Sequence, residues 1–141
     1  MIKIKILSVG KQKHSWLEEA IKEYEKRLTG AVQIEWLLYK SDDQLEANAI
    51  QEKRLICLDP RGIEYDSPQF SQFIQKELNQ HGPRLTFIIG GALGLCEALK
   101  EKANHTISVS KLTFTHQLAR LILVEQLYRS LEIAKNSPYH K

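Results

Sequence analysis

The chain has 141 residues, of which 43% are hydrophobic, and it carries a formal net charge of +3. This length and apolar content fit one domain, residues 1–141, with a substantial core. No apolar run approaches the ~18 residues that a membrane span requires, and residues 1–6 alternate unlike a signal peptide. We therefore expect a soluble, cytoplasmic protein in which the two isolated cysteines, Cys57 and Cys96, are reduced.

The apolar pattern predicts strands that alternate with helices along the whole chain. Period-two alternation or short apolar runs place the strands at residues 2–9, 32–38, 55–58, 85–89 and 106–109. Helical spacing predicts helices that begin at Ser15, Asp42 (to about residue 53), Ser67, after Gly94 (about ten residues) and at His116. Strands joined through helices indicate an α/β fold with a mostly parallel sheet and helices on both faces.

Local signals predict some of the boundaries of these elements. Ser15-x-x-Glu18 has the spacing of a capping box at a helix start. Ser67 followed by Pro68 is the expected N-cap and first residue of another helix. Residues 59–62, Asp-Pro-Arg-Gly, favour a turn that closes the third strand.

The C-terminal segment, residues 108–141, differs from the rest of the chain. Residues 1–103 are neutral, with fifteen Lys/Arg and fifteen Asp/Glu, so the whole net charge lies in residues 104–141. The last helix is apolar around nearly its whole circumference, whereas a surface helix of a monomer has a polar side. We therefore expect this helix to be buried on two sides, against its own sheet and against a second copy in a homodimer.

Ligands of open parallel sheets bind beyond the carboxyl ends of the strands. Three segments lie at such ends here: residues 58–62, the glycine loop 90–94, and residues 108–114. A dinucleotide-binding fingerprint, a Walker phosphate loop and a Gly-x-Ser-x-Gly elbow are all missing. The five histidines are scattered without metal-ligand spacing, so we expect no metal.

Polar side chains of the last helix have ordinary structural explanations as well as functional ones. His116 at the helix start can serve in packing or capping. Arg120 and Arg129 on an otherwise apolar helix each need a carboxylate, a phosphate or water, and pairing with Glu125 or Glu132 is the ordinary expectation.

Several motifs together resemble one known family over nearly the whole chain. These motifs are SVGK at residues 8–11, YEKRL at 24–28, IGGALGL at 89–95, and SVSKLTFTHQLARLILVEQLYRSLEIAKNSPYHK at 108–141. They resemble the bacterial ribosomal RNA large subunit methyltransferase H family, the 23S rRNA pseudouridine N3-methyltransferases of the SPOUT class. Thr115 departs from the proline usual in the family, and the chain is shorter than typical, apparently near residues 41–53.

The resemblance implies a C-terminal trefoil knot and a site for S-adenosylmethionine. The residues that match the family's cofactor loops are Leu58, Gly90, Val109, Ser110, Lys111, Leu112, Thr113 and Phe114. It also implies a homodimer in which the tail of one subunit helps to form the active site of the other. The residues that match its catalytic or RNA-binding positions are Arg129, Tyr139, His140 and Lys141.

The substrate implied by the resemblance is the helix-69 pseudouridine of 23S rRNA, methylated at N3 in the assembled 70S ribosome. The small net charge leads us to expect poor activity on naked rRNA and better activity on ribosomal particles. Two alternatives are a related knotted methyltransferase that acts on tRNA, and a non-catalytic module that binds ribosomes or RNA.

Overall fold

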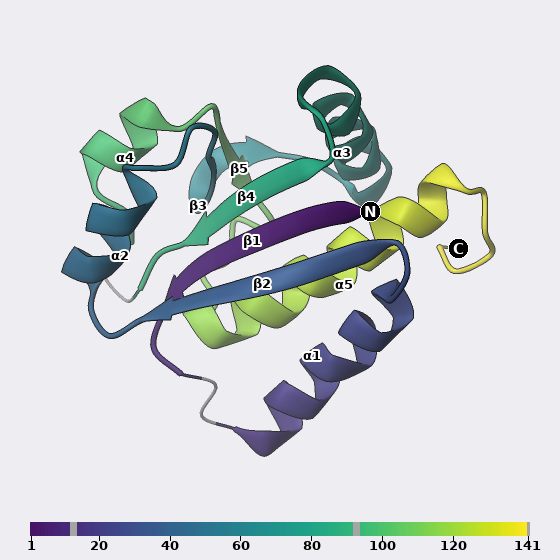
Figure 1. Ribbon diagram of the computed structural model, residues 1–141, viewed down its shortest axis with the longest axis horizontal. Helices are drawn as coiled ribbons and strands as arrows, with labels where there is room; N and C mark the ends of the chain where they lie inside the picture. The colour runs from purple at the N-terminus through teal and green to yellow at the C-terminus, as the bar shows by residue number, and fades with distance from the viewer. Residues whose placement is uncertain (12–13, 92–93, 141) are drawn as a thin grey trace.

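A five-stranded parallel sheet forms the centre of the molecule in the computed structural model, which describes residues 1–11, 14–91 and 94–140 (Figure 1). The strands are β1 (Ile2–Val9), β2 (Val32–Tyr39), β3 (Ile56–Glu64), β4 (Arg84–Ile89) and β5 (His105–Ser108). The helices are α1 (Ser15–Leu28), α2 (Asp42–Ala49), α3 (Ser67–His81), α4 (Glu97–Lys102) and α5 (His116–Ala134). The strand order is β2-β1-β4-β3-β5, and every neighbouring pair is parallel.

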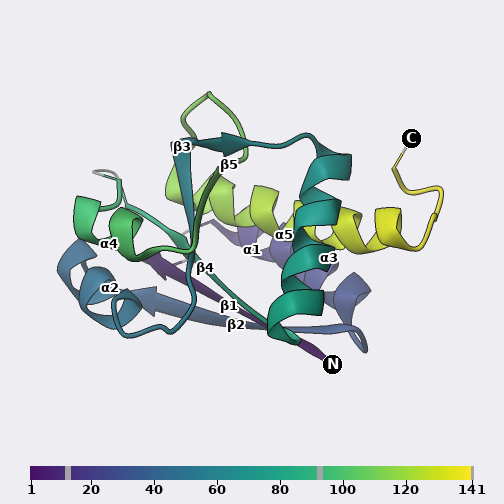
Figure 2. The same ribbon diagram turned by 90° about the horizontal axis from the view of Figure 1, so that it is seen from above.

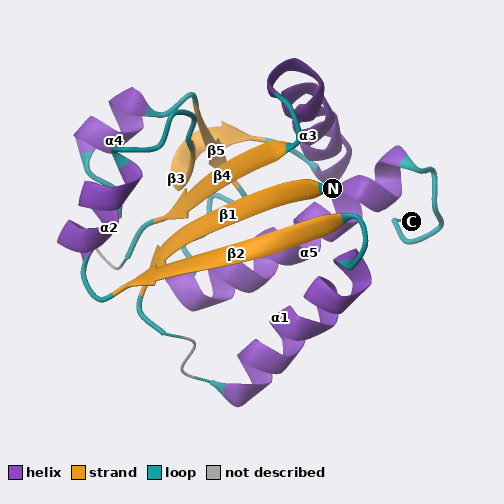
Figure 3. Ribbon diagram, viewed as in Figure 1, coloured by secondary structure: helices purple, strands orange, loops and turns teal. Residues whose placement is uncertain are grey.

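Helices cover both faces of the sheet, which confirms the expected α/β architecture (Figure 3). On one face α1, α3 and α5 enclose a core that contains Ile6, Phe87 and Leu127. On the other face α2 and α4 enclose a smaller core that contains Leu7 and Leu99. Ile6 and Leu7 belong to different cores because successive side chains of a strand point to opposite faces.

β3 continues through the segment where the sequence predicted a turn. Its pairing with β5 shifts register between Leu58 and Ile63, so residues 59–62 form an irregularity within the strand. The predicted turn was therefore wrong, because a proline and a glycine also suit a bulge, where one residue lacks a ladder partner. Gly62 packs against β5 so closely that an added Cβ would lie 2.7 Å from the carbonyl carbon of Thr106.

Two of the predicted helix caps were also wrong. α1 already includes Ser15, and its N-cap is His14, whose side chain makes no capping hydrogen bond. α3 is capped by Asp66, which forms a capping box with Gln69, and not by Ser67. Both helices therefore begin one residue earlier than these caps implied, and α2 and α4 are shorter than the sequence suggested.

α5 is buried along one side only. The side chains that face the sheet and the neighbouring helices are Gln117, Arg120, Leu123, Val124, Leu127 and Ser130. On the opposite side Leu118 is 37% exposed, and Leu121 and Ile122 are half-buried. Contacts within one chain therefore leave an apolar surface on α5.

Candidate active site

Adjacent strands bring the predicted cofactor segments to one edge of the sheet. Leu58 of β3 pairs with Ile89 of β4 on one side and with Ile107 of β5 on the other. Gly90 follows directly after β4, and Val109 follows directly after β5. The three segments thus begin side by side, with Leu58 inside β3 next to the carboxyl ends of β4 and β5, and open parallel sheets bind ligands at such ends.

The glycine loop after β4 brings its backbone into close contact. A Cβ added to Gly90 would lie 2.8 Å from the carbonyl carbon of Gly94, and one added to Gly91 would lie 2.6 Å from Oδ1 of Asp42. Gly94 has a φ of +76°, which favours glycine. Residues 92 and 93 of this loop lie outside the described residues. The absence of a side chain at Gly90 and Gly91 thus lets the backbone of this loop pack closely against Gly94 and Asp42.

The loop between β5 and α5 is held by its own serines. The hydroxyl of Ser108 donates to the carbonyl of Ser110 at 2.7 Å, and the amide of Leu112 donates to the hydroxyl of Ser110 at 2.9 Å. The side chain of Lys111 is 82% exposed, although its Nζ lies 3.6 Å from a carboxylate oxygen of Glu64. Leu112 is 71% exposed.

The end of this loop leads into α5. Thr113 is exposed and Phe114 is half-buried. Thr115 is the N-cap of α5, and its hydroxyl accepts a hydrogen bond from the amide of Leu118 at 3.2 Å. This capping hydrogen bond fixes the residue at which the loop ends and α5 begins.

Arg120 is fully buried in the first turns of α5. Its guanidinium donates to the hydroxyl of Ser8 at 3.1 Å and to the carbonyl oxygens of Val9 and Gly10. The expected pairing with a carboxylate of α5 was wrong, because Arg120 lies on the buried side of the helix. Burial lowers its pKa to about 10, so the group stays charged at neutral pH and ties α5 to the end of β1.

At the other end of α5 the C-terminal tail folds back and forms a polar cluster, here called the tail cluster: Glu125, Arg129, Tyr139 and His140. Nε of Arg129 donates to Oε1 of Glu125 at 3.0 Å, and its Nη1 contacts Nδ1 of His140 at 2.9 Å. The hydroxyl of Tyr139 donates to the same Glu125 oxygen at 3.3 Å. Three of the four predicted catalytic residues therefore lie together, and the fourth, Lys141, lies outside the described residues.

Arg129 joins Glu125 and His140 through its guanidinium. A guanidinium has only donors, so Nδ1 of His140 is the acceptor when this contact is a hydrogen bond. The expected pairing of Arg129 with Glu125 is confirmed, and the hydrogen bond that Arg129 donates to this carboxylate raises the pKa of the guanidinium.

Aromatic rings enclose Tyr139. Its ring meets that of Tyr128 edge-on, with centroids 4.8 Å apart, and Cζ of Arg129 lies 4.9 Å from its centroid. Burial, a hydrogen bond with Tyr24 and the negative charge of Glu125 together raise the pKa of Tyr139 to about 12. The phenol therefore keeps its proton and acts as a donor at physiological pH.

The cofactor segments and the tail cluster lie far apart within one chain. Thr115 and Arg129 stand at opposite ends of α5, fourteen residues apart, which corresponds to about 21 Å of helix. Figure 2 shows the C-terminal tail and the β5–α5 loop separated along this helix. The structure thus assembles two groups of predicted site residues and does not bring them together.

Some residues that contact the predicted site residues were not themselves predicted as site residues. Glu125 accepts hydrogen bonds from both Arg129 and Tyr139, and its i,i+4 spacing to Arg129 was the signal that could have identified it. Tyr24 comes from α1 and carries no such signal, because only the tertiary fold brings it to the tail. Arg120 was singled out by the sequence, but its contact with Ser8 spans 112 positions and no local pattern reveals it.

Other chemistries find little support in the described part of the chain. There, no helix is long and apolar enough to cross a membrane, and no group of three or more His, Cys, Asp or Glu side chains could hold a metal ion. Both cysteines are free. Cys57 is buried, which raises its pKa to about 11 and keeps the thiol protonated.

Comparisons of the sequence and of the structure with known proteins both find methyltransferases. A relative from Protochlamydia amoebophila, named ribosomal RNA large subunit methyltransferase H, is 52% identical over 141 residues and covers 100% of both chains. One of the same name from Streptococcus uberis is 41% identical over 160 positions, with 99% of this chain and 100% of the relative covered.

Among solved structures, a probable methyltransferase from Bordetella pertussis has the same fold, with a TM-score of 0.58 at 11% identity. The match covers 92% of this chain and 94% of that one. The family described as "Predicted SPOUT methyltransferase" matches residues 2–140. The chain therefore belongs to the SPOUT methyltransferase family.

Proposed function

We propose that this chain uses S-adenosylmethionine to methylate N3 of the helix-69 pseudouridine of 23S rRNA in the assembled 70S ribosome. The names of its relatives support an rRNA substrate, since each covers essentially the full chain. The observation that carries the proposal is the tail cluster of Arg129, Tyr139 and His140, in which Arg129 lies about 21 Å along α5 from Thr115 at the end of the β5–α5 loop.

This separation implies that a complete active site needs two subunits. The exposed side of α5 carries Leu118, Leu121 and Ile122, and burial of such a surface favours association. A homodimer has the same patch on both subunits. If a two-fold axis passes near Ile122, the two α5 helices run antiparallel, and Arg129 lies beside Thr115 of the partner subunit. The tail cluster of one subunit then faces the cofactor segments of the other.

The cofactor segments suit a ligand that binds to the main chain. Leu58, Gly90 and the run from Val109 to Phe114 would hold S-adenosylmethionine, since these segments lie side by side near the strand ends where open parallel sheets bind ligands. The sulfonium of the bound cofactor supplies an electrophilic methyl group. We also infer the trefoil knot of the family, supported by the passage of α5 from edge strand β5 back beneath the sheet to contact α1 and α3.

The tail cluster supplies the polar groups that the reaction needs on the RNA side. N3 of pseudouridine loses an imide proton, so negative charge develops on the neighbouring carbonyl oxygens. The guanidinium of Arg129, together with the ammonium of Lys141, can stabilise that charge. His140 can accept the proton at Nδ1 once this atom leaves Arg129. Tyr139 remains protonated and keeps Glu125 in place.

The first experiment compares substrates. Purified protein with labelled S-adenosylmethionine should methylate ribosomes that lack the helix-69 modification, act weakly on naked 23S rRNA, and leave tRNA unmodified. Mass spectrometry should map the methyl group to N3 of the helix-69 pseudouridine. Methylation of tRNA alone would contradict the proposed substrate, and failure to bind S-adenosylmethionine in calorimetry would indicate a non-catalytic module.

A second experiment tests the two-subunit site. Arg129→Ala damages the tail cluster, and Gly90→Val damages the cofactor segment. When the two inactive variants are mixed and exchange subunits, half of the dimers contain one intact composite site, so about a quarter of the wild-type activity should return. If both halves of the site came from one subunit, no activity would return, because each subunit would remain defective.

A further inference from the structure

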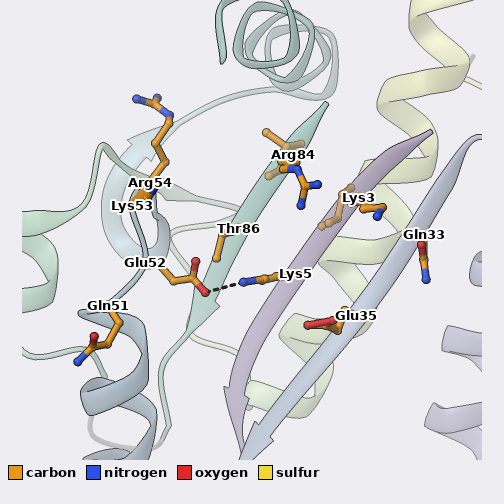
Figure 4. A pocket seen from close by; sticks show the side chains of 12 residues that line it. Lys3, Lys5, Gln33, Glu35, Gln51, Glu52, Lys53, Arg54, Arg84 and Thr86 are labelled. Atoms are coloured by element: carbon orange, nitrogen blue, oxygen red, sulfur yellow. Dashed lines mark hydrogen bonds and ion pairs between the residues drawn. The ribbon is translucent and has the colours of Figure 1, made fainter. Parts of the chain in front are cut away.

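One half of the sheet face on the side of α2 and α4 has no helix over it. Figure 4 shows this surface, here called the open face, at the N-terminal ends of β1, β2 and β4. It forms a depression of about 620 Å³. The polar and charged side chains around it are Lys3, Lys5, Gln33, Glu35, Gln51, Glu52, Lys53, Arg54, Arg84 and Thr86. The alternation of β1 explains the surface, because Ile4 and Ile6 fill the covered face while the lysines between them point away from it.

The charge of the open face is positive and only partly neutralised. Glu52 lies 3.0 Å from Nζ of Lys5. Arg54 is paired with Glu77 at 2.8 Å. Among the described residues, no ion pair involves Lys3, Lys53 or Arg84, and all three side chains are exposed. Three unpaired cations therefore border one depression.

Two of these cations are direct neighbours across the sheet. Lys3 of β1 pairs in register with Arg84 of β4 on one side, and with the uncharged Gln33 of β2 on the other. Like charges opposite each other on adjacent strands destabilise a sheet. A bound anion between them would remove this repulsion, and the unpaired ammonium of Lys53 also borders the depression that would hold this ligand.

We propose that the open face binds the phosphate backbone of ribosomal RNA, as a contact separate from the active site. This inference rests on the proposed function, which makes ribosomal RNA the polyanion that the protein meets. The open face lies on the opposite side of the sheet from α5 and at the opposite strand ends from Gly90 and Val109. A dimer formed through α5 therefore leaves it accessible, and its contacts add affinity without touching the reacting base.

The test compares two charge reversals on exposed, unpaired cations. Arg84→Glu changes the open face, and Lys76→Glu makes the same charge change on α3, which covers the other side of the sheet. Arg84→Glu should raise KM for unmethylated ribosomes roughly tenfold with kcat unchanged. It should also reduce the slope of log affinity against log salt by about one. S-adenosylmethionine affinity should stay constant, and Lys76→Glu should behave like wild type.

Stability separates binding from a structural role. Arg84→Glu places a carboxylate opposite Lys3, so its melting temperature should equal or exceed that of wild type, and Arg84→Lys should retain ribosome affinity. Equal ribosome affinity and salt slope for Arg84→Glu and Lys76→Glu would overturn the inference. So would an Arg84-dependent binding of phosphatidylglycerol vesicles or polyglutamate without any effect on ribosome binding. If wild type binds ribosomes through Arg84 yet transfers no methyl group, the proposed function fails and this inference stands.

Discussion

The two ends of α5 differ in how their side chains are held. At the N-terminal end the β5–α5 loop is fixed by its own serines and presents Leu112 with 71% of its surface exposed. Toward the C-terminal end the side chains of Arg129 and Tyr139 both donate hydrogen bonds to Glu125. The first end offers mainly backbone to a cofactor, whereas the second depends on particular side chains. Substitutions at the two ends should therefore separate cofactor binding from methyl transfer.

The largest effect is expected from Arg129→Ala. It removes the guanidinium that contacts both Glu125 and His140, so kcat should fall by about 10²–10³-fold, the usual loss for a donor that stabilises developing charge. Affinity for S-adenosylmethionine, measured by calorimetry, should not change. Arg129→Lys keeps the charge but not the forked geometry, and should recover only part of the rate. A normal single-turnover rate for Arg129→Ala would show that the tail cluster takes no part in the reaction.

Gly90→Val should produce the complementary defect. Its added side chain would meet the carbonyl carbon of Gly94 at 2.8 Å from Cβ, so the loop must shift. We expect affinity for S-adenosylmethionine to fall by about tenfold or more, because a backbone site tolerates little displacement. Unchanged cofactor affinity for Gly90→Val would show that the glycine loop is not part of the site.

Thr115→Val tests the boundary between the cofactor loop and α5. Loss of the hydroxyl that caps the helix should cost about 1 kcal/mol of stability. S-adenosylmethionine affinity should weaken by a few fold, since Phe114 directly precedes the cap. Thr115→Ser keeps the cap and should match wild type in chemical denaturation. If Thr115→Val lowered kcat with cofactor affinity unchanged, the two ends of α5 would be less independent than their contacts indicate.

Tyr139→Phe should have the smallest effect on activity, a few-fold decrease in kcat, because it removes one hydrogen bond to Glu125. Its clearer signature is in the pH dependence of stability. Tyr139 has a pKa of about 12 in the folded chain against 10.0 for the free group, so the folded state retains a proton that the unfolded state releases. This contribution is complete below pH 10 and is lost as the pH rises toward 12. Tyr128→Phe serves as the matched control, and equal slopes for the two variants would contradict the assignment.

Periodic apolar residues allowed much of the fold to be predicted. Alternating isoleucines located β1, and local signals located the starts of α1 and α3 to within one residue. The prediction failed where the same residue types occur both in turns and in bulged strands. The segment Asp59–Gly62 has turn-forming residues, but pairing with β5 holds it in a bulged strand. Such pairing depends on residues distant in sequence and leaves no local pattern.

The candidate site was predictable to a similar degree. Strand ends pointed to the cofactor segments, and the resemblance indicated the tail residues, but neither revealed that Glu125 links Arg129 to Tyr139. For the open face, the residues could be identified from the sequence but their exposure could not. The lysines at positions 3 and 5 were visible in the sequence as the polar half of a strand, yet a central parallel strand is normally covered on both faces. Only the placement of α2 and α4 shows that these lysines remain exposed.

The buried bond between Arg120 and Ser8 also bears on how the chain reaches its native state. It joins positions 112 residues apart, and β1 lies inside the sheet between β2 and β4. During synthesis, the end of β1 must therefore wait for α5, which is almost the last element to leave the exit tunnel. Contacts of such long separation slow folding because the intervening chain must be ordered first. The hydrogen bonds of Arg120 to the end of β1 can thus form only when the chain is nearly complete. A late folding step is therefore a direct consequence of this one buried guanidinium.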